Sequence, residues 1–311
     1  MSHATYRIPD IVAAKATAAG DDGIRWLQAI DDTVSDLAAQ WSITIGRQLS
    51  GGTTALVVRA TLASGEPAVL KLAVPGSSFA AQARTLVAAE GRGYVRALAH
   101  DAARDAVLLE GLGERLDRSG RPAEAQLTTL GRLLRVAWEV PRPDEAPHDK
   151  ASSLAELVRE LAGSLGPACP THVIERALRC AAGRAAAFLP ERCVTVHGDA
   201  AAANVLAVPH PREGAVDGYV FVDPDGFVGD PEYDLGVAVR DWGPELLAAP
   251  DPRPMLRGWC DLLAAETGAD PAAVWEWGYL ERVSTGLYLL SLGAKEWAAP
   301  FLTTAAALAA G

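Results

Sequence analysis

Cysteine is scarce in this chain, and the four that are present form no recognisable metal or redox motif. No Cys-x-x-Cys pair occurs, and no cysteine lies near a histidine at the spacing of a zinc site, which excludes the common zinc-binding patterns. Scattered thiols are typical of a reducing compartment, so we expect free cysteines and a cytoplasmic location. The four residues are Cys169, Cys180, Cys193 and Cys260.

Long hydrophobic runs are also missing. No stretch of about 20 uninterrupted apolar residues occurs, which is the length that a membrane-spanning helix needs. The segment Met1–Asp10 lacks the apolar core of a signal peptide. The apolar C-terminal run Trp297–Gly311 is short and is interrupted by Pro300. We therefore expect no membrane span and no membrane partner, and a closing helix at the C-terminus.

Basic residues are outnumbered by acidic ones, with 28 Lys and Arg against 39 Asp and Glu and a formal net charge of −11. A surface of this sign repels polyanions, so a nucleic-acid partner is not expected. The acidity suits a cationic small molecule as substrate, although many cytosolic proteins are acidic. Charge alone therefore leaves the substrate open.

The first third of the chain is rich in β-type patterns. A helical apolar pattern over Asp22–Trp41 precedes it. Ser64-Gly65 marks a hairpin turn, and a further helix is expected over Ser78–Glu90. The expected β segments are Ile43–Ile45, Leu49–Arg59 with its Gly-containing turn, Pro67–Val74, Val95–Leu98 and Val107–Glu110.

The rest of the chain is mainly helical in its periodicity, with one β-type island. A length of 311 residues suits two coupled lobes. Because a mostly antiparallel sheet precedes the helices, we expect an α+β fold with a small β-rich lobe, residues 1–111, and a larger helical lobe, residues 112–311. The helical ranges are Gln126–Val140, Ser153–Leu165, Thr171–Leu189 and most of the chain from Tyr233 onward; the island comprises Val194–Val196 and Tyr219–Val222.

Two short segments of the second lobe carry oxygen-bearing side chains at the ends of apolar strands. His197-Gly198-Asp199 is followed five residues later by Asn204, and the next strand delivers Asp223. Phosphoryl transfer needs one carboxylate to orient the attacking hydroxyl, and a second carboxylate with an amide to hold Mg²⁺. Asp199 fits the catalytic base, and Asn204 and Asp223 fit the metal ligands. We expect His197 to pack within the loop and to bond to its backbone.

This combination resembles the aminoglycoside phosphotransferases and, among them, the streptomycin 6-kinase and hydroxyurea phosphotransferase group. A His-Gly-Asp tripeptide alone arises by chance, but the spacing to Asn204 and the strand-borne Asp223 are more specific. The resemblance covers nearly the whole chain and implies a protein-kinase-like two-lobed fold that uses ATP and Mg²⁺. It rests on Ala68–Lys71, Gly91–Leu98, Val107–Glu110, His197–Asp199 and Val222–Leu235.

The resemblance implies roles in nucleotide binding. Lys71 would contact the α- and β-phosphates, and Glu110 and Leu112 would belong to the hinge whose backbone binds adenine. Small residues would let backbone N–H groups approach the phosphates. These residues are Ser50, Gly51, Gly52 and Thr53, with Thr54 completing the loop.

Lys71 lacks an obvious partner in the sequence. In the wider kinase pattern the lysine pairs with a glutamate on the following helix. The helix expected over Ser78–Glu90 offers only Gln82 and Glu90, and Glu90 lies at its end beside Gly91. The partner of Lys71 therefore stays unassigned.

Substrate contacts are less well defined by the sequence. A cationic acceptor would require carboxylates in the cleft of the second lobe, and Asp225 and Asp230 are the candidates. Asp230 and Asp234 also suit a structural role, because the run that contains them would open a helix. Trp275 and Trp277 could stack on an acceptor or belong to the core.

The function implied by the resemblance is transfer of the γ-phosphoryl group of ATP to a hydroxyl of an aminoglycoside, with the 6-hydroxyl of streptomycin first, which would confer antibiotic resistance. Two alternatives stay open: another small acceptor, such as an amino sugar, hydroxyurea or an unidentified metabolite, or a nucleotide-binding regulator without turnover. The choice between monomer and homodimer is also open.

Overall fold

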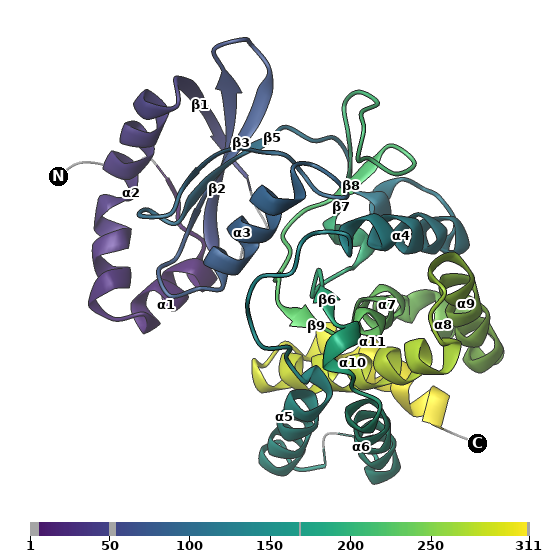
Figure 1. The fold of residues 1–311 in the computed structure, drawn as a ribbon. Helices are drawn as coiled ribbons and strands as arrows, with labels where there is room; N and C mark the ends of the chain where they lie inside the picture. The colour runs from purple at the N-terminus through teal and green to yellow at the C-terminus, as the bar shows by residue number, and fades with distance from the viewer. Residues whose placement is uncertain (1–5, 50–53, 168, 310–311) are drawn as a thin grey trace.

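The computed structural model describes residues 6–49, 54–167 and 169–309, which form two lobes of different composition (Figure 1). A β-rich lobe is built from the first part of the chain, and a mainly helical lobe from the remainder. The fold class predicted from the sequence, α+β with a small β-rich lobe before a larger helical lobe, is confirmed. No helix among these residues is long and apolar enough to cross a bilayer.

The β-rich lobe contains a five-stranded antiparallel sheet. Its strand order is β1-β2-β3-β5-β4, so β3 pairs with β5 rather than with β4, and β4 lies at the edge beside β5. Strand β3 lies at the centre, where Lys71 pairs with Val57 of β2 and with Val107 of β5. The strands are β1 (Ile43–Gln48), β2 (Ala55–Leu62), β3 (Pro67–Ala73), β4 (Ala97–Asp101) and β5 (Ala106–Glu110).

Helices cover both faces of this sheet (Figure 1). Helix α2 (Asp21–Gln40), preceded by α1 (Asp10–Ala18), buries Ile30, Val34 and Leu37 in one cluster with Leu70 and Leu72. Each such side chain contributes about 1.5–3 kcal/mol on burial. Because side chains alternate along a strand, Lys71 points to the opposite face, where α3 (Phe79–Ala89) lies.

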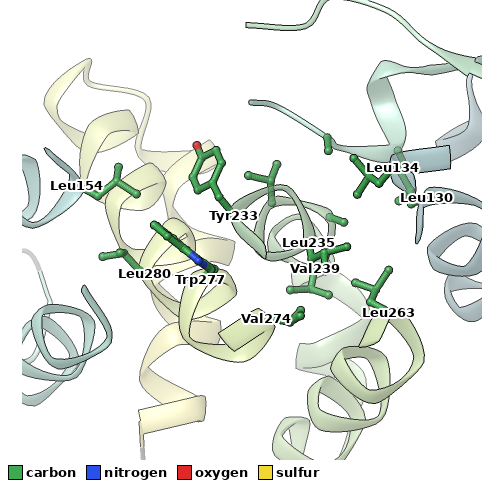
Figure 2. Packing of buried hydrophobic residues seen from close by; sticks show 14 of the residues in the cluster. Leu130, Leu134, Leu154, Tyr233, Leu235, Val239, Leu263, Val274, Trp277 and Leu280 are labelled. Atoms are coloured by element: carbon green, nitrogen blue, oxygen red, sulfur yellow. The ribbon is translucent and has the colours of Figure 1, made fainter. Parts of the chain in front are cut away.

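The helical lobe is organised around α10 (Pro271–Ser291). This helix packs on α5, α6, α7, α9 and α11. Figure 2 shows Trp277 of α10 beside Tyr233 of α7, with Leu263 and Leu130 on the other side of α7. The other helices are α4 (Ala123–Ala137), α5 (Lys150–Ser164), α6 (Thr171–Ala186), α7 (Pro231–Arg240), α8 (Gly243–Ala248), α9 (Pro252–Thr267) and α11 (Lys295–Ala309).

Two short two-stranded sheets belong to the helical lobe. The pairs are β6 (Val194–Thr195) with β9 (Val228–Gly229), and β7 (Val205–Ala207) with β8 (Tyr219–Phe221). The backbone of Phe221 is bonded to the loop after α3: Val95 N–H donates to its carbonyl at 2.8 Å, and its own N–H donates to the Gly93 carbonyl at 2.9 Å. The strand that leads to Asp223 is thereby attached to the β-rich lobe.

The element boundaries differ from the sequence prediction in a few places. Strand β4 runs over Ala97–Asp101 rather than Val95–Leu98, because Val95 is used in the link to Phe221. Strands β7 and β9 are only two or three residues long and gave no periodicity to detect. All four cysteines are free, as predicted.

Packing between α7 and α10 depends on Gly236. A Cβ at this position would lie 2.3 Å from the Cβ of Trp277, so Gly236→Ala forces the two helices apart. We expect this substitution to lower the free energy of unfolding by about 1–3 kcal/mol. Gly258→Ala in α9 is the matched control, because a Cβ there meets no atom within 4 Å. It is expected to stabilise by about 0.5–1 kcal/mol. Urea unfolding measures both, and equal effects would contradict this packing.

Candidate active site

The segment after β6 carries Asp199 and is held by Asp234 of α7. The Asp234 carboxylate is fully buried and accepts hydrogen bonds from the backbone N–H groups of His197 and Gly198, both at 2.8 Å. Trp138 Nε1 donates to the same carboxylate at 3.0 Å. Burial raises the pKa of Asp234, and these donors oppose that rise. Helix α7 therefore fixes the start of the segment.

His197 lies inside this segment with no exposed surface. Its Nδ1 accepts from the Asp199 N–H at 3.1 Å, and its Nε2 lies 2.9 Å from the Val222 carbonyl oxygen. The ring packs against Phe221, with ring centroids 4.5 Å apart. It thus joins the Asp199 segment to the strand that carries Asp223.

Asp199 lies beyond His197 with about half of its side chain exposed. Its Oδ1 accepts from Arg240 Nη2, and its Oδ2 from Asn204 Nδ2, both at 2.9 Å. Burial raises the pKa of Asp199, but the Arg240 charge and hydrogen bond outweigh burial and bring the pKa below its ordinary value. The carboxylate is therefore ionised at neutral pH and oriented from two sides.

Asn204 precedes β7 and Asp223 follows β8, at the same end of this antiparallel pair. Val222 N–H donates to the Asn204 carbonyl at 2.9 Å, so the residue before Asp223 is bonded directly to Asn204. Asp223 has a left-handed backbone with φ of 56°, and half of its side chain is exposed. Asn204 uses its Nδ2 to bond Asp199, which leaves its amide oxygen for another ligand.

A divalent cation fits this pair of oxygen ligands. Among the described residues there is no group of three or more His, Cys, Asp and Glu that could form a closed metal site. Mg²⁺ is commonly held by one or two protein oxygens and completed by water and phosphate oxygens. The Asp223 carboxylate and the Asn204 amide match that mode of binding.

Lys71 contacts both lobes. Its Nζ lies 2.8 Å from Asp223 Oδ1 and 2.6 Å from Gln82 Oε1 of α3. Gln82 Nε2 also donates to the Pro224 carbonyl at 3.2 Å. Gln82 therefore occupies the place of the partner that the sequence left unassigned. In the sequence, Gln82 shares helical spacing with the apolar Phe79 and Leu86, which predicts that it lies on the buried face of α3.

Of the other residues predicted to bind the nucleotide, the structure describes Glu110 and Leu112. Glu110 ends β5, and its carboxylate accepts from Arg96 N–H at 2.8 Å and pairs with Arg212. Leu112 is partly buried against the main core. Ser50, Gly51, Gly52 and Thr53 lie outside the described residues.

A pocket of about 290 Å³ opens beside Asp199. Asp225 lines it and Asp230 does not: the Asp230 carboxylate caps α7 by accepting from Glu232 N–H at 2.9 Å, and it also accepts from Trp277 Nε1. Trp277 belongs to the core. The lining residues are Lys150, Leu154, Leu157, Gly198, Asp199, Asp225, Tyr233, Arg240, Glu281, Ser284, Thr285 and Tyr288.

Gly198 is required where the pocket meets the Asp199 segment. Its φ is 89°, and a Cβ there would lie 2.8 Å from Asp225 Oδ2. Partial burial raises the pKa of Asp225, and the neighbouring Asp199 carboxylate raises it further. The two carboxylates thus share one wall of the pocket. A larger cavity, about 500 Å³, lies between α6, α9 and α10; Trp275 lines it, but none of the predicted catalytic, metal-binding or nucleotide-binding residues does.

Removing the Asp234 carboxylate should disrupt the site through its backbone. Asp234→Ala leaves the His197 and Gly198 N–H groups and Trp138 Nε1 buried without their acceptor, at a cost of about 1–3 kcal/mol for each group. We expect a lower midpoint of urea unfolding. Asp36→Ala, at an exposed position on α2, should stay within about 0.5 kcal/mol of the parent. Equal stability of the two variants would contradict the role of Asp234.

Two known phosphotransferases are similar to this chain in sequence. Over 307 residues the chain is 29% identical to a streptomycin 6-kinase of Streptomyces glaucescens, covering 97% of this chain and 96% of the relative. A hydroxyurea phosphotransferase of Kitasatospora aureofaciens is 29% identical over 238 residues, 75% of this chain and 67% of the relative.

Solved structures agree on the fold. A choline/ethanolamine kinase family protein from Mesorhizobium loti superposes with a TM-score of 0.60 at 18% identity, covering 91% of this chain and 95% of that one. The family model for aminoglycoside/hydroxyurea antibiotic resistance kinases matches residues 40–293. The chain therefore belongs to the family of aminoglycoside/hydroxyurea antibiotic resistance kinases, and its two lobes have the protein-kinase-like fold.

Proposed function

We propose that this protein transfers the γ-phosphoryl group of Mg²⁺-ATP to a hydroxyl of a small cationic acceptor, and that streptomycin, at its 6-hydroxyl, is the first acceptor to test. The proposal is carried by one observation: an oriented carboxylate, Asp199, lies in the wall of a pocket and is bonded to Asn204. The streptomycin 6-kinase relative supports the choice of acceptor. Inactivation of an antibiotic is the proposed consequence.

The nucleotide would lie between the lobes, which we propose to divide near Leu112 into residues 1–111 and 112–311. Lys71 would neutralise phosphate charge from the β-rich lobe. Asp223 and Asn204 would hold Mg²⁺, which supplies charge neutralisation at the phosphates when bound. Glu110 and Leu112 would contribute the hinge, and Ser50, Gly51, Gly52 and Thr53 the covering loop.

Asp199 would act on the acceptor. The acceptor hydroxyl would donate its hydrogen bond to Asp199, which orients the oxygen toward the phosphorus. As the new oxygen–phosphorus bond forms, the bond to the ADP oxygen breaks, and the hydroxyl proton passes to Asp199 and then to solvent. Because the transition state is loose, positioning matters more than the basicity of the carboxylate. A low pKa of Asp199 is compatible with this role.

The charges in the pocket favour a cationic acceptor. Three carboxylates line it, and Arg240 pairs with Asp199 and Glu281. Asp225 forms no salt bridge among the described residues. Burial raises the pKa of Asp225, and the positive charge of Lys150 lowers it in part without a direct contact between the two side chains. Asp225 would therefore receive a cationic group of the acceptor. Asp230 is not proposed for this role, because both of its oxygens bond within the protein.

A second acceptor class is hydroxyurea, which one relative phosphorylates according to its name. Hydroxyurea is uncharged and small, so it would need Asp199 but would not need Asp225. A regulator without turnover is disfavoured, because Lys71, Asp199, Asn204 and Asp223 are all present and brought together.

A coupled ADP-release assay tests the proposed function. Purified protein with Mg²⁺-ATP is offered streptomycin, a 2-deoxystreptamine aminoglycoside, hydroxyurea and glucosamine in parallel. We expect streptomycin-dependent turnover that falls by at least about 10²-fold in Asp199→Ala, which removes the orienting carboxylate. Turnover with hydroxyurea alone would assign the second class. No turnover with any acceptor, despite binding of Mg²⁺-ATP, would refute the proposed acceptors.

Asp225→Asn separates the two acceptor classes. Loss of a charge-assisted contact of about 1.5–3 kcal/mol should raise KM for streptomycin about 10–100-fold. KM for hydroxyurea, measured in the same assay, should stay within about twofold. An unchanged KM for the cationic acceptor would remove Asp225 from the acceptor site.

A further inference from the structure

Arg240, the last residue of α7, was not singled out from the sequence, yet it contacts Asp199 directly. It follows the apolar run Leu235–Val239 at the end of a buried helix. Arginine is rarely buried without a partner, so a single arginine in this position was a signal in the sequence. Only 14% of its side chain is exposed, and it forms part of the pocket wall.

Its guanidinium bonds three carboxylates at once. Nη2 donates to Asp199 Oδ1 at 2.9 Å, and Nη1 donates to Glu281 Oε2 at 3.2 Å. Nε donates to Asp241 Oδ1 at 2.7 Å, and Nη2 also contacts Asp241 Oδ2 at 3.1 Å. The planar fork of arginine can satisfy acceptors in several directions, which the single ammonium group of lysine cannot do.

Two of these carboxylates fix Arg240 itself. Glu281 lies on α10 and is 4% exposed, so it cannot move without disturbing the core. Asp241 follows Arg240 in the chain and holds the other side of the fork. Asp199 is the third and most exposed member, and apart from Arg240 its carboxylate is held only by Asn204. The buried Glu281 of α10 thus holds Arg240, and Arg240 in turn holds Asp199.

Charge gives Arg240 a second effect on the same carboxylate. Asp199, Asp225 and Glu281 line one pocket, and without Arg240 their like charges would repel one another. Asn204 secures only Oδ2 of Asp199. Oδ1 depends on Arg240, so loss of the guanidinium would leave one oxygen unsecured beside two negative neighbours.

We propose that Arg240 is a positioning residue of the phosphotransfer site, which holds the Asp199 carboxylate in the orientation that receives the acceptor hydroxyl. The role rests on the proposed function of Asp199. It predicts an effect on turnover rather than on nucleotide binding, because Arg240 does not contact Lys71 or Asp223.

Arg184 provides a matched control. It also is a largely buried arginine of the helical lobe, with 12% of its side chain exposed, and it pairs with Glu232 and Glu276. It does not line the pocket of Asp199. Arg184→Gln therefore measures what the loss of such an arginine does to the fold alone.

The kinetic test compares Arg240→Gln, Arg240→Lys and Arg184→Gln in the ADP-release assay. We expect Arg240→Gln to lower kcat by about 10²-fold, the effect of a misplaced catalytic group, with KM for ATP within about twofold. Arg240→Lys should recover only part of the loss, and Arg184→Gln should keep kcat. In an Asp199→Asn background, Arg240→Gln should cause little further loss.

Several results would overturn the role. Equal losses of kcat in Arg240→Gln and Arg184→Gln would show a general structural effect. A full additional loss in the Asp199→Asn background would show that Arg240 acts independently of Asp199. If Arg240→Gln fails to fold, Arg240→Lys decides, because unchanged turnover in that variant would show that the fork geometry is not needed.

A crystal structure of Arg240→Gln, or of Arg240→Lys, separates this inference from the proposed function. We expect the Asp199 carboxylate to leave the position observed here or to occupy more than one rotamer. An Asp199 side chain that keeps its place and its bond to Asn204 would refute the positioning role, whether or not any acceptor is phosphorylated. Absence of turnover in the unmodified protein would instead count against the proposed function alone.

Discussion

The bond between one buried carboxylate and two backbone N–H groups organises the centre of this molecule. Asp234 is rigid because α7 is packed between α4, α9 and α10, and it fixes the peptide groups of His197 and Gly198. A buried carboxylate is costly unless its oxygens accept hydrogen bonds. The same contacts that satisfy Asp234 therefore determine where the following residue, Asp199, is placed.

The two lobes are joined at the site by few but specific contacts. The backbone of Phe221 bonds to Gly93 and Val95, and Lys71 reaches Asp223 across the lobes. Gln82 binds Lys71 and the Pro224 carbonyl, so an amide links α3 to the loop after β8. A neutral amide can do this because it both accepts and donates. In the wider kinase pattern the lysine pairs with a glutamate on the following helix. Here a neutral glutamine on that helix bonds the lysine instead.

The sequence predicted the lobes and the principal acidic residues because these depend on local patterns. Strand alternation placed Lys71, and the short loops after apolar strands placed Asp199 and Asp223. Gln82 and Arg240 were not assigned, because their roles arise from contacts between residues 11 to 142 positions apart in sequence. Asp230 illustrates the same limit: its acidic side chain resembles a substrate ligand in sequence but caps a helix in the structure.

The most direct measurement of the central claim is a crystal structure of the protein with Mg²⁺ and a non-hydrolysable ATP analogue. The account predicts Mg²⁺ bound by the Asp223 carboxylate and the Asn204 amide oxygen, Lys71 on the phosphates, and Asp199 facing the 290 Å³ pocket. A nucleotide bound elsewhere, or a metal ion that contacts neither Asp223 nor Asn204, would contradict it.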